Sequence, residues 1–141
     1  MLKMLEKQIV YQIVSSLTAA LYFYLFVMLL FFPASFLRDI GVETNASAEF
    51  LARRAAMLML AFAFLAFFGR KLSQPSAKQV VTAAISLNMA GFAVMGLFEF
   101  GRGFVNAEIL VIVAIEALLA VLYFLFWLSA WRMGKTRQTE Q

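Results

Sequence analysis

The sequence predicts an all-α membrane protein, an antiparallel bundle of four transmembrane helices. Hydrophobic residues make up 64% of the 141 residues and charged residues only 14%, whereas about a quarter of the residues in a soluble domain are charged. The apolar residues also form four long runs, and each run approaches the ~20 residues that a helix needs to cross a bilayer. We therefore treat residues 1–141 as a single transmembrane domain.

The first span is predicted over residues 9–32, because no charged residue lies between Lys7 and Arg38. This run is longer than the apolar segment of a secretory signal peptide, so we expect it to be retained as a membrane helix. Pro33 follows the run. Proline lacks a backbone donor and disfavours helix at the residue before it, so the first helix should end or kink there.

The other three spans are predicted to be joined by short connections. They cover residues 50–69, 78–98 and 108–131. Asn45 is a good N-cap for the second span and Asn106 for the fourth. Ala84 and Gly91 lie in the third span, where small residues would let a partner helix approach closely. The polar segment 134–141 is predicted to be a disordered tail.

Basic residues indicate the orientation of the bundle. The side that holds both termini carries Lys3, Lys7, Arg70, Lys71, Lys78, Arg132, Lys135 and Arg137. The other side carries Arg38, Arg53, Arg54 and Arg102. By the positive-inside rule, the N- and C-termini are predicted to be cytoplasmic. The same rule accounts for the net charge of +4, so we expect no nucleic-acid partner.

Residue types that catalyse reactions or bind metals are scarce. The chain has no cysteine and no histidine, which excludes disulfides and thiolate nucleophiles and removes the commonest metal ligand and general base. We find no phosphate-binding glycine loop, no nucleophile elbow and no metal-ligand spacing. We therefore expect no cofactor, no metal and no catalytic site.

Charged residues lie inside two of the predicted spans. The uncharged run that follows Arg54 ends at Gly69 and covers only ~22 Å of helix, against a hydrocarbon core of ~30 Å. Arg53 and Arg54 should therefore lie within the outer edge of the apolar layer. Glu116 is flanked by apolar residues in the fourth span, where a carboxylate must be paired, hydrated or neutral.

Counting along the helices places these charges at similar depths. Arg54 should lie ~24 Å from Arg70 along its helix, and Glu116 ~22 Å from Trp131 along the fourth. We therefore predict that Glu116 pairs with Arg54 or Arg53. The predicted ligand-binding or coupling residues are Glu116, Arg54, Arg53, Asn88, Tyr123 and Thr18, and Tyr22 could add a further hydroxyl.

Two interpretations of this polar cluster remain open. Buried polar residues sometimes only fix how helices rotate and align against one another. Ionisable residues within a membrane are also candidates for a ligand, proton or ion site. The sequence alone does not separate a structural network from a functional one.

The segment between the first two spans resembles a known group of proteins. It contains Pro33, the run Leu37-Arg38-Asp39-Ile40-Gly41-Val42, and the arginines Arg53 and Arg54. In these features the chain resembles small four-helix bacterial membrane proteins of the DoxX-like and related uncharacterised families. The resemblance implies this architecture and a location in the bacterial inner (plasma) membrane. It implies no particular activity, because a shared fold does not define a function.

These observations favour a small inner-membrane protein that is not an enzyme. It would bind an apolar or amphipathic ligand, or act as an accessory or assembly subunit. The alternative is an oligomeric small transporter or channel that uses the Arg–Glu–Asn cluster, and a membrane enzyme relying on Glu116 as a neutral acid ranks third. The expected partners are membrane lipids and a second copy of the chain or a larger membrane complex.

Overall fold

The fold is described by a computed structural model, which covers the backbone of residues 2–138 and the side chains of residue 6 and residues 8–132. All regular elements in this range are helices, which confirms the predicted fold class. They are α1 (Leu2–Phe31), α2 (Pro33–Asp39), α3 (Ala46–Gly69), α4 (Pro75–Gly101) and α5 (Ile109–Gln138). Stretches long and apolar enough to cross a membrane are Gln8–Phe31, Ala46–Gly69, Pro75–Gly101 and Ile109–Arg132.

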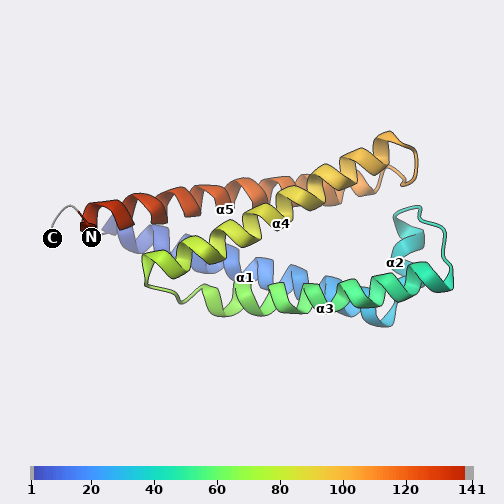
Figure 1. The fold of residues 1–141 in the computed structure, drawn as a ribbon, viewed down its shortest axis with the longest axis horizontal. Coiled ribbons are helices and arrows are strands. Elements are labelled where there is room, and N and C mark those ends of the chain that lie inside the picture. The colour runs from blue at the N-terminus through green and yellow to red at the C-terminus, as the bar shows by residue number, and fades with distance from the viewer. Residues whose placement is uncertain (1, 139–141) are drawn as a thin grey trace.

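The long helices run up and down along one axis (Figure 1). α1 begins and α5 ends on the same side of the molecule, which we call the terminal end. α2 and the connection between α4 and α5 lie on the opposite side, which we call the loop end. Short connections between consecutive long helices force this antiparallel arrangement.

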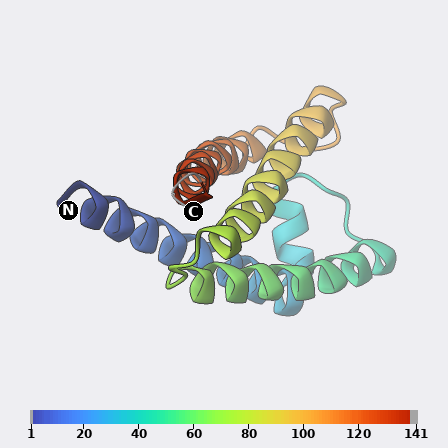
Figure 2. The ribbon, with the colours of Figure 1, turned by 60° about the vertical axis from the view of Figure 1, so that its left-hand side comes forward.

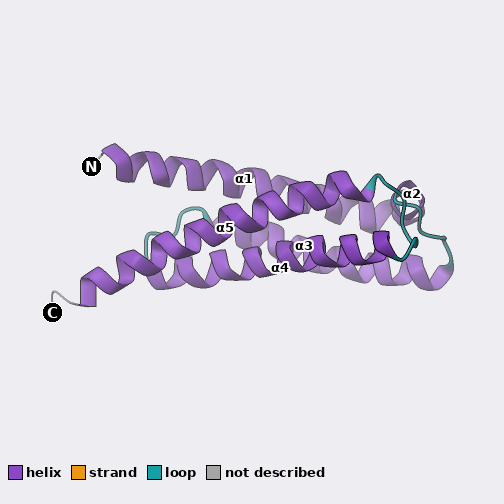
Figure 3. Cartoon of the chain, turned by 90° about the horizontal axis from the view of Figure 1, so that it is seen from above, coloured by secondary structure: helices purple, strands orange, loops and turns teal. Residues whose placement is uncertain are grey.

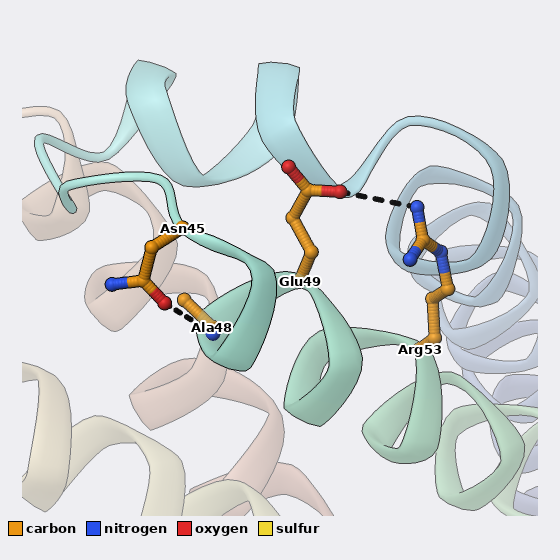
Figure 4. A network of polar contacts seen from close by, with 4 residues as sticks. All are labelled: Asn45, Ala48, Glu49 and Arg53. Carbon is orange, nitrogen blue, oxygen red and sulfur yellow. Dashed lines mark hydrogen bonds and ion pairs between the residues drawn. The ribbon is translucent and has the colours of Figure 1, made fainter.

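Local sequence signals explain where several helices begin and end. α1 stops at Phe31 and Pro33 is the first residue of α2, as expected for a residue that cannot donate to the preceding turn. The Asn45 side chain accepts a hydrogen bond of 2.9 Å from the backbone N–H of Ala48, which confirms it as the N-cap of α3 (Figure 4). The predicted disordered tail, 134–141, begins inside a helix, because α5 continues to Gln138. Residues 139–141 lie outside the described part of the chain.

The bundle consists of two helix pairs. α1 packs closely along α3, and α4 packs closely along α5, whereas the two pairs approach each other less closely (Figure 2). One face of α3 explains the first pairing, because its buried residues recur at intervals of three and four and thus share one side of the helix. They are Ala52, Ala56, Met59, Ala63, Ala66 and Gly69. We call this set the alanine stripe. Small side chains let helix backbones approach closely in a membrane.

Small residues were also predicted to let a partner helix approach the third span. Ala84 and Gly91 lie on α4, but Gly91 is exposed and a Cβ atom added there would meet nothing within 4 Å. Small residues form close helix contacts in the alanine stripe on α3 and also at Gly96 of α4, where an added Cβ atom would lie 2.6 Å from Val113 Cγ2 of α5. The face of α4 that carries Ala84 and Gly91 is open.

α2 lies at the loop end (Figure 3). Its last residue and the residue after it contact the α4–α5 connection, and this contact joins the two helix pairs. The backbone N–H of Asn106 donates to the carbonyl oxygen of Ile40 at 3.0 Å, and the Asn106 amide donates to the carbonyl of Asp39 at 2.8 Å. Gly41 follows with a φ of +85°, and a Cβ atom there would lie 2.8 Å from the backbone nitrogen of Asn106. Glycine is required here both by the backbone conformation and by the close approach of the α4–α5 connection.

Candidate functional site

A row of polar side chains runs down the buried face of α1. Its members are Tyr11, Ser15, Thr18 and Tyr22, all almost completely buried. Their spacing of four, three and four residues places the hydroxyl groups on one side of the helix. We call this set the hydroxyl row. Buried polar groups require hydrogen-bond partners, so the row shows where α1 meets its neighbours.

The part of the hydroxyl row nearer the terminal end contacts α3 and α5. The Tyr11 hydroxyl donates to the backbone carbonyl of Gly69, the last residue of α3, at 3.1 Å. The Tyr123 hydroxyl, which comes from α5, donates to Ser15 Oγ at 3.3 Å. α1 is therefore joined to one helix of each pair by the hydroxyl groups of buried tyrosines.

The part of the hydroxyl row nearer the loop end contacts α4. Asn88 Nδ2 donates to the Tyr22 hydroxyl at 2.7 Å, and the Tyr22 ring stacks on Phe62 of α3 with ring centroids 5.4 Å apart. Thr18 lies beside Tyr123 and donates its own hydroxyl to the carbonyl of Val14, one turn earlier in α1, at 2.8 Å. Three predicted site residues, Asn88, Tyr123 and Thr18, thus lie on or beside the hydroxyl row.

Glu116 lies near this row and forms no ion pair with a described side chain. It is half-buried and shares a side of α5 with Val113, Ala120 and Tyr123, at helical spacing. Its carboxyl group lies near the Tyr22 hydroxyl. Among the side chains that the structure describes, the ion pairs are Arg53–Glu49 and Arg102–Glu99, and neither includes Glu116.

The predicted pairing of Glu116 with Arg54 or Arg53 is therefore wrong. Arg53 Nη2 instead lies 3.1 Å from the Glu49 carboxylate, one turn earlier in α3, with half of its side chain exposed (Figure 4). The Arg54 guanidinium lies over the Phe50 ring, 5.8 Å from its centroid. Both arginines turn toward the loop end, where their charge is closer to water.

The error came from the assumed alignment of the helices. The prediction placed Arg70 and Trp131 at the same depth, but Tyr11 contacts both the Gly69 carbonyl and the Phe126 ring. The end of α3 is thus level with Phe126, ~7 Å from Trp131 along α5. Phe62 is the α3 residue level with Tyr22, and Arg54 lies eight residues from Phe62, which is ~12 Å along the helix.

Part of the hydroxyl row was not predicted from the sequence. Tyr11 and Ser15 were absent from the predicted site, although both are buried and both contact another helix. The recurrence of hydroxyl-bearing residues at helical spacing in the first span would have shown them. A polar stripe on one side of an otherwise apolar membrane helix indicates the side that faces protein.

Asn88 lines an open groove between α3 and α4 as well as contacting the hydroxyl row. The groove encloses about 580 Å³ and is lined by Phe62, Ala84, Leu87, Asn88, Gly91, Phe92 and Met95. We call it the mid-span groove. Asn88 is its one polar lining residue, and Gly91 leaves the groove open, since a Cβ atom added to this glycine would have no atom within 4 Å.

The carbonyl oxygen of the Asn88 side chain is accessible. Its amide nitrogen is the atom that bonds to Tyr22, and its oxygen accepts no hydrogen bond from a described residue. No buried side-chain nitrogen or oxygen in the described range lacks a partner. The Asn88 oxygen is therefore not fully buried, and it has free acceptor capacity beside the mid-span groove.

Removing the hydroxyl group of Tyr22 tests the contact between the two helix pairs. Tyr22→Phe keeps the ring on Phe62 but leaves the Asn88 amide without its acceptor. We expect the free energy of unfolding to fall by about 1 kcal/mol, since hydrogen bonds between membrane helices contribute about 0.6 and at most about 1.7 kcal/mol. Unfolding by SDS in mixed micelles measures this. Tyr24→Phe, on the exposed side of α1, is the control, and an equal effect of both changes would contradict the prediction.

Comparisons with protein-family models, with characterised proteins and with solved structures gave no match. The resemblance to DoxX-like families therefore stays a prediction. Within the described residues, no group of three or more acidic side chains is arranged to hold a metal ion. What the fold and composition do establish is a small integral membrane protein with a helical bundle.

Proposed function

We propose that this protein binds a membrane-dissolved, mainly apolar molecule that carries a hydrogen-bond donor such as a hydroxyl group, and that it does so in the mid-span groove. The observation that carries this proposal is the accessible oxygen of Asn88 in a groove whose other lining residues are apolar or glycine. An apolar body would fill the groove, and the donor would bond to this oxygen.

The membrane makes an unfilled acceptor costly. The hydrocarbon core holds no water to bond to a polar group, and each unsatisfied group there costs several kcal/mol. Asn88 lies near the middle of α4, far from either interface. A ligand hydroxyl would relieve this cost, whereas a plain hydrocarbon chain would not.

The shape of the groove also supports a ligand of moderate size. Its volume of about 580 Å³ is within the ~300–1,000 Å³ typical of small-molecule sites. Phe62 and Phe92 supply flat apolar surfaces, and Met95 supplies an adaptable one. Binding needs no catalytic group, in agreement with the expected lack of enzymatic chemistry.

We also infer that the terminal end faces the cytoplasm of a bacterial cell. The support is the distribution of lysine and arginine, which favours the side of the membrane that holds both termini. A cysteine-labelling experiment on intact cells, with single cysteines introduced at Ser73 and at Ala107, tests this orientation. Only the cysteine at position 107, at the loop end, should react with a membrane-impermeant reagent.

Filling the groove is the direct test of ligand binding. Gly91→Leu would place a side chain at the groove, and nothing lies within 4 Å of the added Cβ atom. Gly101→Leu is the matched control, since Gly101 is on the same helix, has equally open surroundings and does not line the groove. The probe is a long-chain alcohol that carries a photoreactive diazirine, added to protein in lipid nanodiscs, and mass spectrometry locates the labelled residues.

We expect the alcohol to label residues of the mid-span groove in the wild type and in the Gly101→Leu variant. Labelling should fall at least tenfold in the Gly91→Leu variant, and the methyl ether of the same alcohol, which cannot donate a hydrogen bond, should label the wild type less. Equal labelling of all three proteins, or equal labelling by alcohol and ether, would refute the proposed function.

A further inference from the structure

We propose a second binding site, for the headgroup of an anionic phospholipid, at the terminal end between α1 and α3. It is separate from the mid-span groove and does not depend on the function proposed for that groove. The site is a groove of about 460 Å³ lined by Ile9, Gln12, Ile13, Ser16, Leu17, Arg70 and Lys71. We call it the basic groove.

Arg70 is held in place by uncharged neighbours. Its Nη1 donates to Ser16 Oγ at 2.8 Å, and its guanidinium stacks 3.8 Å from the centroid of the Phe67 ring. A guanidinium has five N–H donors, so the bond to Ser16 leaves several donors for a ligand. Both contacts limit the motion of the side chain, which reduces the entropy that is lost when an anion binds.

No carboxylate among the described side chains forms an ion pair with the cations of the basic groove. The ion pairs among the described side chains are Arg53–Glu49 and Arg102–Glu99. Both lie toward the loop end, at the far side of the bundle from Arg70. Lys71 is exposed and adjacent to Arg70, so two cations that lack an ion-pair partner among the described side chains lie side by side at the terminal end.

The remaining lining residues indicate that the anion belongs to a lipid. Ile9, Ile13 and Leu17 recur along α1 and are each more than half exposed. Ile13 and Leu17 lie on either side of Ser16, to which Arg70 donates, and Leu17 continues toward the middle of the membrane, where it can contact acyl chains. Gln12 and Ser16 add hydrogen-bonding groups near the headgroup level. A free phosphate ion would use the cations but not this apolar surface.

Charge and geometry together select an anionic headgroup. Arginine binds phosphate oxygens with two parallel hydrogen bonds, and lysine adds a point charge. A headgroup with a net negative charge, such as phosphatidylglycerol, would balance the two cations, whereas a zwitterionic one would bring its own cation. The cytoplasmic leaflet, which the terminal end is inferred to face, is the one that attracts such basic residues through its anionic lipids.

Native mass spectrometry of the full chain in detergent, titrated with phosphatidylglycerol or phosphatidylcholine, tests this site. Each basic residue near a lipid surface contributes about 1 kcal/mol, so removing two should weaken phosphatidylglycerol binding about 30-fold, and removing one about fivefold. The variants are Arg70→Gln with Lys71→Gln together, and Lys71→Gln alone. The single variant carries the test if the double variant does not fold, because Lys71 is exposed.

The matched control is Arg53→Gln with Arg54→Gln, which removes two adjacent charges toward the other end of α3, the helix that Arg70 and Lys71 follow. We expect it to bind phosphatidylglycerol like the wild type, and we expect phosphatidylcholine to bind more weakly to every variant that keeps Arg70 and Lys71. Unchanged affinity after loss of Lys71, or equal affinity for the two lipids, would overturn the proposal. Complete competition by millimolar glycerol phosphate would replace the lipid site with a site for free anions.

Discussion

Replacing Ala56 with leucine is expected to destabilise the protein more than any change on the exposed side of the same helix. Ala56 is completely buried and lies in the alanine stripe, where α3 packs against α1. The added carbon atoms would push the two helices apart or force neighbouring side chains out of their preferred rotamers. Overpacking of this kind costs about 1–3 kcal/mol and occasionally more.

Ala61→Leu provides the comparison for this prediction. Ala61 is exposed on α3, so the same added atoms would meet lipid and should change the free energy of unfolding by only a few tenths of a kcal/mol, the usual range for surface substitutions of about ±0.5 kcal/mol. SDS titration of both variants, followed by circular dichroism or by tryptophan fluorescence, measures the difference. Similar midpoints for the two variants would mean that the alanine stripe is not a packed interface.

Gly96→Leu should have the second large effect, because it separates α4 from α5. A Cβ atom at Gly96 would lie 2.6 Å from Val113 Cγ2 and 3.6 Å from Ile109 Cγ1. Val113 is buried and β-branched, so it has few alternative rotamers. We expect a loss of about 3 kcal/mol, at the upper end of the costs measured for overpacked sites.

Gly91→Leu is the internal comparison for Gly96→Leu. The two glycines lie on one helix and receive the same side chain, but Gly91 has nothing within 4 Å of its added Cβ atom. Its stability should equal that of the wild type or exceed it slightly, because leucine favours helix more than glycine does. Thermal unfolding in one detergent ranks the two variants, and the reverse ranking would show that α4 and α5 do not pack as described.

The helices could be predicted because crossing a membrane depends mainly on length and composition. Long apolar runs defined the spans. Pro33 lacks a backbone donor and so marks the end of α1, and the Asn45 side chain caps the start of α3. The seven-residue helix α2 was not predicted, since its sequence carries no periodic apolar pattern. Its last residue, Asp39, and the following Ile40 accept hydrogen bonds from Asn106, which is distant in sequence.

The candidate site was predicted only in part, because it depends on how the helices align. Asn88, Thr18 and Tyr123 stand out individually as polar residues in apolar runs, and the structure brings them to one row. Predicting the partner of Glu116 required the relative depth of α3 and α5 in the bundle. No sequence feature links the depth of one of these helices to that of the other. Depth counted from charged ends was wrong by more than one turn of helix for Arg54, since Trp131 lies ~7 Å beyond the level at which α3 ends.

The division into two helix pairs has a consequence for the order in which the chain assembles. Each pair consists of long helices that follow one another in the sequence, so each can close as a hairpin as soon as its second helix enters the bilayer, with only a short connection to order. α1 and α3 can thus pack before α4 has been synthesised. Ser15 and Tyr22 gain their partners Tyr123 and Asn88 only afterwards, which makes the meeting of the hydroxyl row with its partners a late step of biogenesis.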